Sequence, residues 1–258
     1  MVVIQVVVLV IGFPLIYLLS RVLRVRSKPI AIADSKREAI LACLVMAAAF
    51  FMVFAWRAWM HLSQFDLRSA FYIDFIDISL MLVLYIPVLL VVALAMKRSG
   101  QSLESIGITG KDRGRMLVLG VAISAIFVTI SGLLAPSLGV SFAGFSPSLA
   151  CGLVLFAIAG FSEEIVWRGY VQTRLTAYSG KLTGLVVTSS LFAVLWHFPV
   201  AYYVETSGVF LEALAWAMMR VVPGLLFGYL MLKSQNIIPS SIFHLFWNWN
   251  TLIWQLSF

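Results

Sequence analysis

The sequence is built from about eight apolar stretches of roughly 20 residues each, and this length constrains the fold more than any other feature. An α-helix needs about 20 apolar residues to cross the hydrocarbon core of a bilayer. The mean hydropathy of +1.02 and the charged fraction of only 11% lie outside the range of soluble domains. The sequence therefore predicts an all-α protein, a polytopic membrane bundle of about eight transmembrane helices.

The apolar stretches follow one another along the chain and leave no room for a second domain, so we expect residues 1–258 to form a single integral membrane domain. The first stretch lacks a basic leading segment and an A-x-A-like cleavage site, and arginines follow it, so we expect a retained helix rather than a signal peptide. The stretches are Val2–Leu19, Ile40–Met60, Ile76–Ala95, Met116–Pro136, one that starts near Leu149, Leu182–Tyr203, Val209–Leu232 and Ile237–Leu256.

Positive charges predict the orientation of the chain, because Lys and Arg near helix ends stay on the cytoplasmic side of a membrane. Of the 18 lysines and arginines, all except Arg57, Arg68 and Arg220 lie in or beside loops on one side of the predicted bundle. We therefore expect both termini outside and basic loops in the cytosol, in a bacterial or archaeal cell membrane. These loops suit anionic lipid headgroups, and they do not form the single basic face that nucleic-acid binding requires. The basic residues on this side are Arg21, Arg24, Arg26, Lys28, Lys36, Arg37, Lys97, Arg98, Lys111, Arg113, Arg115, Arg168, Arg174, Lys181 and Lys233.

Two adjacent glutamates, Glu163 and Glu164, lie with Arg168 at the end of the fifth apolar stretch. Ionised groups at membrane depth are costly unless they are partnered, so such a set marks a functional site by default. Glu164 and Arg168 have i,i+4 spacing, and a purely structural salt bridge is an alternative interpretation of this pair. Glu163 points about 100° away around the helix and has no partner nearby in the sequence, which favours a functional role.

The fifth and sixth helices are expected to be antiparallel and joined by a turn at Gly180, so residues equidistant from the turn lie at the same height. Glu163 and His197 are each 17 residues from Gly180, and Glu164 is 16 residues from it. At 1.5 Å per residue, all three lie about 25 Å from the turn. We therefore expect the two carboxylates and this imidazole at one level on neighbouring helices.

Gln235 lies in the turn of the last hairpin. A second histidine, His244, follows it by nine residues and is therefore about 13 Å from that turn. If His244 is to meet the glutamates, the hairpin of the fifth and sixth helices must extend roughly 10 Å further on the cytosolic side than the last hairpin does. Asn248 follows His244 by four residues and shares its helix face. The polar residues in the lower part of the longer hairpin are interpreted as a wetted surface, namely Arg168, Gln172, Thr173, Arg174, Ser179 and Lys181.

Two carboxylates, two imidazoles and an amide are the groups that water-mediated amide hydrolysis uses. A carboxylate can act as a general base toward water, and a neighbouring imidazole can orient that water or carry its proton. A second imidazole and an amide can donate to the charge that develops on a carbonyl oxygen. The same groups suit zinc, but there is no H-E-x-x-H spacing, and neither G-x-S-x-G nor G-x-G-D is present. We expect a hydrolase without a cofactor, with a metal site as the alternative.

Three motifs occur in order along the second half of the chain: E-E-I-V-W-R-G-Y-V-Q-T-R-L from Glu163, F-A-V-L-W-H from Phe192, and H-L-F-W-N from His244. They resemble the E-E-x-x-x-R-G-Y-x-Q-x-R-L, F-x-x-x-H and H-x-x-x-N motifs of the CAAX-protease and bacteriocin-processing family (CPBP, or Abi) of intramembrane glutamic endopeptidases. The resemblance covers residues 102–250, whereas residues 1–100, with three helices, carry no recognised motif. The aromatic position of the second motif is occupied by Ala193, and Phe192, one residue earlier, is expected to serve in packing.

The resemblance implies a role for each of six residues. The roles are water activation by Glu163 and His197, support of the site by Glu164 and Arg168, and stabilisation of the oxyanion by His244 and Asn248. The leading hypothesis is therefore an intramembrane endopeptidase that cleaves a peptide or a membrane-anchored protein, prenylated or not. A membrane protein that binds a peptide without cutting it, as an immunity protein does, is one alternative. A proton-coupled transporter is another, although it predicts inverted repeats that the sequence does not show.

Overall fold

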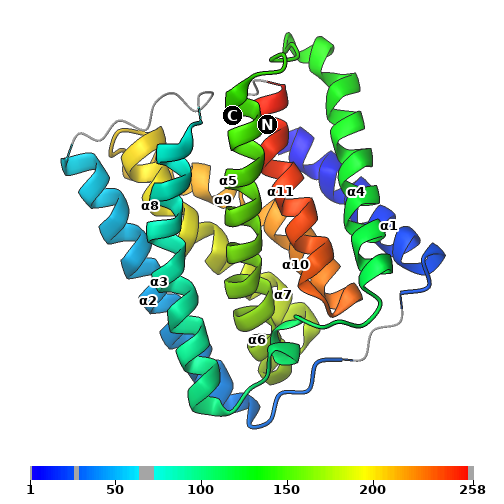
Figure 1. The fold of residues 1–258 in the computed structure, drawn as a ribbon, viewed down its shortest axis with the longest axis vertical. Helices are drawn as coiled ribbons and strands as arrows, with labels where there is room; N and C mark the ends of the chain where they lie inside the picture. The colour runs from blue at the N-terminus through cyan, green and yellow to red at the C-terminus, as the bar shows by residue number, and fades with distance from the viewer. Residues whose placement is uncertain (1, 26–28, 64–72, 255–258) are drawn as a thin grey trace.

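The computed structural model describes residues 2–25, 29–63 and 73–254, and every regular element within these ranges is helical (Figure 1). The elements in chain order are α1 (Val2–Val22), α2 (Ser35–Leu62), α3 (Phe75–Ser99), η1 (Leu103–Ile106), α4 (Arg113–Leu134), η2 (Ala135–Leu138), α5 (Pro147–Glu164), η3 (Ile165–Gln172), α6 (Thr173–Ser179), α7 (Lys181–Leu191), η4 (Phe192–His197), α8 (Phe198–Val200), η5 (Ala201–Glu205), α9 (Phe210–Met218), α10 (Val221–Ser234) and α11 (Ile237–Ile253).

The prediction of an all-α membrane bundle with about eight helices is confirmed. Within the described residues, six helical segments are long and apolar enough to cross a membrane, and Val8–Val22 is a shorter apolar helix. α11 adds a further helix of 17 residues. The predicted features that lie outside the described residues are Arg26, Lys28, Arg68 and the end of the last stretch at Leu256.

α11 is the central helix of the second half of the chain. It packs between α4 and α5, and α1 packs against α10 and α4 (Figure 1). On the other side of α5, α3 packs against α5 and pairs with α2. Large apolar side chains cover much of the outside of these helices, including Leu44, Phe51, Val83, Leu94 and Leu117. This exposed apolar surface is what a helix bundle presents to lipid.

The two helices that carry most of the polar residues begin with side-chain caps. The hydroxyl of Ser146 accepts a hydrogen bond from the backbone N–H of Leu149 at 3.2 Å, and Pro147 is the first residue of α5. The side chain of Asn236 accepts from the N–H of Ile238 at 2.9 Å at the start of α11. Each cap satisfies a backbone donor that the helix itself leaves free, and proline is pre-organised for the first helical position.

Two membrane spans change helical type beside the predicted site. α5 passes directly into the π-helical segment η3 and then into α6, and α7 passes into the π-helical segment η4. Because a π-helix bonds residue i to i+5, it shifts the direction of the following side chains relative to an α-helix, and such segments are frequent at functional sites. η3 begins directly after Glu164 and η4 ends at His197.

The seventh apolar stretch, expected as one helix over Val209–Leu232, is interrupted. α9 ends at Met218, α10 begins at Val221, and Arg220 is the N-cap residue of α10. Pro223 explains the interruption, because it has no N–H to donate to the carbonyl four residues earlier. The break places the side chain of Arg220 between two helices rather than in the middle of one.

The interpretation of the lower hairpin as a wetted surface was wrong for Arg168, Gln172 and Arg174, which are buried, whereas Ser179 and Lys181 are exposed. The guanidinium of Arg174 donates to the carbonyl of Ser105 at 2.8 Å and to its hydroxyl at 2.9 Å, and it forms an ion pair with Glu38 at 3.4 Å. Arg168 and Gln172 are buried as well, whereas the end of α6, from Ala177, and the start of α7 are exposed. Internal partners from α2 and η1 replace water here.

α5 and α11 approach each other closely at Gly160. A Cβ atom at this position would lie 3.1 Å from the backbone nitrogen of Leu245 and 3.2 Å from the carbonyl oxygen of Ser241. Gly160 lies about one turn before the glutamates, and the two α11 residues flank His244. The missing side chain therefore lets the two backbones approach at the height of the site.

We expect Gly160→Val to destabilise the protein by about 1–3 kcal/mol, because the added methyl groups overpack the contact between α5 and α11. Equilibrium unfolding in mixed detergent micelles measures this difference. Gly114→Val is the matched control, since a Cβ at Gly114 on α4 meets nothing within 4 Å. Equal stability of the two variants would contradict a tight helix contact at Gly160.

Candidate active site

The carboxylate of Glu163, at the end of α5, is buried and faces two other helices. Its Oε1 accepts a hydrogen bond from the hydroxyl of Tyr85 on α3 at 2.5 Å, and its Oε2 lies 3.7 Å from Nε2 of His244 on α11. Oε2 has no hydrogen-bond partner among the described residues. One oxygen is therefore held by the protein, and the lone pairs of the other are available to accept a proton.

Glu164 lies at the centre of a buried ionic network. Its Oε1 is 3.0 Å from Nδ1 of His244 and 3.4 Å from Nη1 of Arg168, and the side chains of Glu164 and Arg168 are both 0% exposed. The salt bridge that the i,i+4 spacing predicts is thus confirmed, but it also holds the imidazole of His244. Removal of one partner from such a buried pair typically costs about 3–5 kcal/mol, because the other charge is left uncompensated.

Two phenylalanines fix the orientation of the cationic groups. The guanidinium carbon of Arg168 lies 4.2 Å from the ring centroid of Phe192 and 5.4 Å from that of Phe227. The ring of His244 stacks on Phe227 with centroids 4.4 Å apart and an interplanar angle of 22°. Arg168 Nη2 also donates to the carbonyl of Gly224 at 3.3 Å. The expected packing role of Phe192 is confirmed, and it includes a cation–π contact.

His197 and Asn248 lie beside this network rather than within it. The ring of His197 is edge-on to Phe192 with centroids 4.8 Å apart, and Phe192 also meets the ring of His244 edge-on at 6.1 Å. Asn248 is half-buried, one turn after His244 on α11. Neither residue makes a side-chain hydrogen bond within the described part of the chain. The predicted residues in direct contact are Glu163, Glu164, Arg168 and His244.

The contact between His244 and the glutamates shows that the two hairpins are offset, as their spacing predicts. Glu164 is 16 residues from Gly180, whereas His244 is nine residues from Gln235. In Figure 1 the turn between α6 and α7 accordingly lies lower than the turn between α10 and α11. The longer hairpin extends beyond the shorter one, and this offset brings the three groups to one height.

Tyr85 and Phe227 are site residues that the sequence analysis missed. Both lie in apolar stretches outside the three motifs, where an aromatic residue is normally assigned to packing. A signal was present for Tyr85, because tyrosine usually lies at the membrane interface and this one occupies the middle of a span. No comparable signal distinguishes Phe227 from its apolar neighbours.

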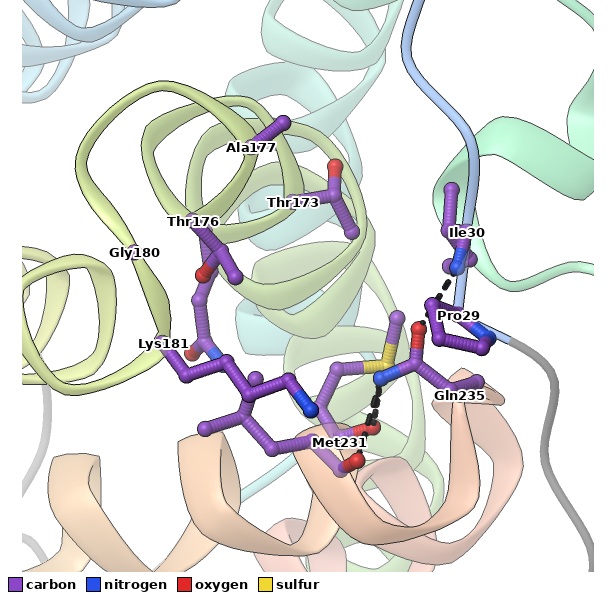
Figure 2. A pocket seen from close by; sticks show the side chains of 11 residues that line it. Pro29, Ile30, Thr173, Thr176, Ala177, Gly180, Lys181, Met231 and Gln235 are labelled. Atoms are coloured by element: carbon purple, nitrogen blue, oxygen red, sulfur yellow. Dashed lines mark hydrogen bonds between the residues drawn. The ribbon is translucent and has the colours of Figure 1, made fainter.

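Among the described residues, no group of three or more His, Cys, Asp and Glu side chains has an arrangement suited to a metal ion. A cavity of about 220 Å³ lies at the lower end of the site-bearing span, between α6, α7 and the end of α10 (Figure 2). Gln235 closes one side of it by donating to the carbonyls of Met231 and Leu232 and accepting from the N–H of Ile30. None of the six predicted site residues lines this cavity.

The fold and the site define a multi-pass membrane protein with an acid–imidazole centre buried between its helices. Residues 145–250, from the start of α5 through most of α11, match the family model described as Rce1-like, type II CAAX prenyl endopeptidase. The match contains all six predicted site residues, and it confirms the resemblance to the CAAX-protease family over this region. No curated protein and no solved structure gives a match.

Replacement of Tyr85 by Phe tests the hydrogen bond that holds Glu163. The ring can keep its stacking on Trp196, whereas the buried Oε1 loses its donor. We expect a loss of about 1–3 kcal/mol in the free energy of unfolding, measured in mixed micelles. Tyr178→Phe, at a side chain that is 58% exposed, should change it by less than about 0.5 kcal/mol. Indistinguishable stabilities would mean that the bond contributes nothing.

Proposed function

We propose that this protein is an intramembrane endopeptidase in which Glu163 and His197 activate a water molecule for attack on a peptide bond. The observation that carries the proposal is the contact of His244 with both glutamates, at 3.0 Å from Glu164 and 3.7 Å from Glu163. These ionisable groups are buried among apolar helices, in the region that matches a protease family. Such groups are retained at membrane depth mainly where they serve a function.

Glu163 is the general base in this mechanism. Tyr85 occupies Oε1, which leaves Oε2 to accept a proton from water. The water oxygen then bonds to the carbonyl carbon of the peptide, the C–N bond breaks, and the proton held by Glu163 passes to the leaving amine. His197 orients the water or carries its proton, a role open to an imidazole near neutral pH.

His244 and Asn248 stabilise the negative charge that develops on the substrate carbonyl oxygen. Glu164 accepts a hydrogen bond from Nδ1 of His244 and thereby directs Nε2 toward the side of Glu163. As an imidazolium, His244 donates from Nε2 to the oxyanion, and the amide of Asn248 supplies a second donor. Glu164 and Arg168 act through His244 and do not touch the substrate.

The substrate that we propose is a protein or peptide with a prenylated C-terminal C-a-a-X sequence. This substrate class follows from the description of the matching family as type II CAAX prenyl endopeptidases. The exposed apolar surface of the bundle supports it, because a prenyl chain dissolved in the bilayer reaches the protein through that surface. Cleavage after the prenylated cysteine releases the last three residues.

We expect Glu163→Gln to lower kcat/KM by at least about 10²-fold, because the amide cannot accept the proton from water. The measurement is cleavage of a farnesylated, fluorophore–quencher C-a-a-X peptide by purified protein in nanodiscs. Glu104→Gln is the control, since this glutamate lies on η1 with a side chain that is 67% exposed. Wild-type cleavage by Glu163→Gln would refute the mechanism. Recovery of intact peptide from a stable complex with the unmutated protein would instead indicate a binding protein.

A mechanism that uses only these side chains predicts that chelators leave the cleavage rate unchanged. The same peptide assay is run after incubation with EDTA and with 1,10-phenanthroline. Loss of activity that added Zn²⁺ restores would replace the proposed general-base role of Glu163 with a role as metal ligand. Comparative peptidomics of membranes that contain wild-type or Glu163→Gln protein then identifies the natural substrate.

A further inference from the structure

Two arginines near Glu163 have no role in the mechanism above. Arg57 lies on α2 with a side chain that is 8% exposed, and Arg220 is half-buried at the break between α9 and α10. Both interact electrostatically with Glu163 and also with Glu205, at the end of η5. The two guanidinium groups therefore share one neighbourhood, which borders the site on the side of Glu163.

Neither guanidinium group forms an ion pair among the described residues. The Nε atoms of Arg57 and Arg220 are buried and have no hydrogen-bond acceptor among the described residues. The Nε of Arg168 also lacks an acceptor among the described residues, but Arg168 and Arg174, which are buried too, each form an ion pair with a glutamate at 3.4 Å. A buried arginine is costly to keep without an anionic partner. The contrast indicates that Arg57 and Arg220 are kept for an anion that binds from outside.

The nearby carboxylates do not fill this role. Glu205 is exposed, and its interaction with the two arginines does not include an ion pair among the described residues. The carboxylate of Glu163 is held by Tyr85 and faces His244. The two arginines thus interact electrostatically with the buried carboxylate of Glu163 and with the exposed carboxylate of Glu205. They form an ion pair with neither of these two glutamates.

Arg220 is held in a fixed orientation. Its guanidinium carbon lies 4.2 Å from the ring centroid of Trp216, and its carbonyl accepts a hydrogen bond from the N–H of Gly224 at 3.1 Å. The planar guanidinium presents two parallel N–H donors that match the two oxygens of a carboxylate. Because the helix break fixes Arg220 before any ligand arrives, little conformational entropy is lost on binding.

We propose that Arg57 and Arg220 form a subsite for the C-terminal carboxylate of the peptide that is cleaved. The proposal rests on the proposed function and adds the feature that selects the substrate. Three residues between the scissile bond and the carboxylate span about 10 Å at most, so a carboxylate that the arginines hold about that far from Glu163 leaves the scissile bond at the reacting centre. An amidated or longer peptide leaves both guanidinium groups unpaired, which disfavours cleavage in the middle of a chain.

The test compares two farnesylated fluorophore–quencher peptides that differ only in ending as a free acid or as a carboxamide. In nanodiscs of neutral lipid, we expect wild-type protein to cleave the acid with a kcat/KM at least about tenfold higher. Arg57→Gln and Arg220→Gln should each bring this ratio close to one, and Arg57→Lys should retain part of it. The ratio is measured within one preparation, so any misfolded fraction cancels. Arg98→Gln, at an exposed position at the end of α3, should keep the wild-type ratio.

A binding measurement separates this subsite from the peptidase activity. A fluorescent tripeptide, as acid and as amide, is titrated into wild-type protein and followed by anisotropy. If no peptide is cleaved but the acid binds more tightly and Arg57→Gln removes the difference, the proposed function fails and the subsite stands. If both peptides are cleaved equally well, the subsite is overturned and the peptidase stands. Loss of the preference for the acid in nanodiscs of anionic lipid would mean that the arginines bind lipid phosphate, and this result would also overturn the carboxylate subsite.

Discussion

The buried ion pair between Glu164 and Arg168 is the interaction on which the arrangement of the site depends. Neither side chain reaches solvent, and a buried ion pair depends on further contacts to offset the loss of hydration of its two charges. Those partners are His244 of α11, the carbonyl of Gly224 on α10 and the ring of Phe192 on η4. The contacts of this one pair therefore bring four segments together, and the same convergence places Glu163 beside His244.

The thirteen-residue first motif serves two separate purposes in the fold. Its beginning supplies the two glutamates and the first arginine to the site, whereas Arg174, near its end, ties the span to Glu38 of α2 and Ser105 of η1. The second arginine thus anchors the part of the chain that carries no recognised motif to the part that does. The π-helical segment between them turns the side chains so that one continuous span reaches partners on opposite sides.

Features that depend on local spacing were predicted well. The apolar stretches gave the helices to within a few residues, because the length of a span is set by the thickness of the bilayer. The pairing of Glu164 with Arg168 follows from i,i+4 geometry alone. The interpretation of a wetted hairpin was wrong for its buried residues, because the polarity of Arg174 does not tell whether it meets water or a partner 69 residues away. The break before Pro223 was missed because hydropathy describes side chains, whereas the break arises from the missing backbone N–H of proline.

The sequence by itself determined the class of fold, the order of the helices and the chemical groups available at membrane depth, since each depends on residue type and local periodicity. Only the tertiary structure decided how those groups are connected: Tyr85 holds one oxygen of Glu163, His244 joins both glutamates, and the Nε atoms of Arg57 and Arg220 find no acceptor among the described residues. These contacts join helices that are far apart in the chain. They depend on how the helices rotate and pack against one another, and no local pattern of residues encodes that arrangement.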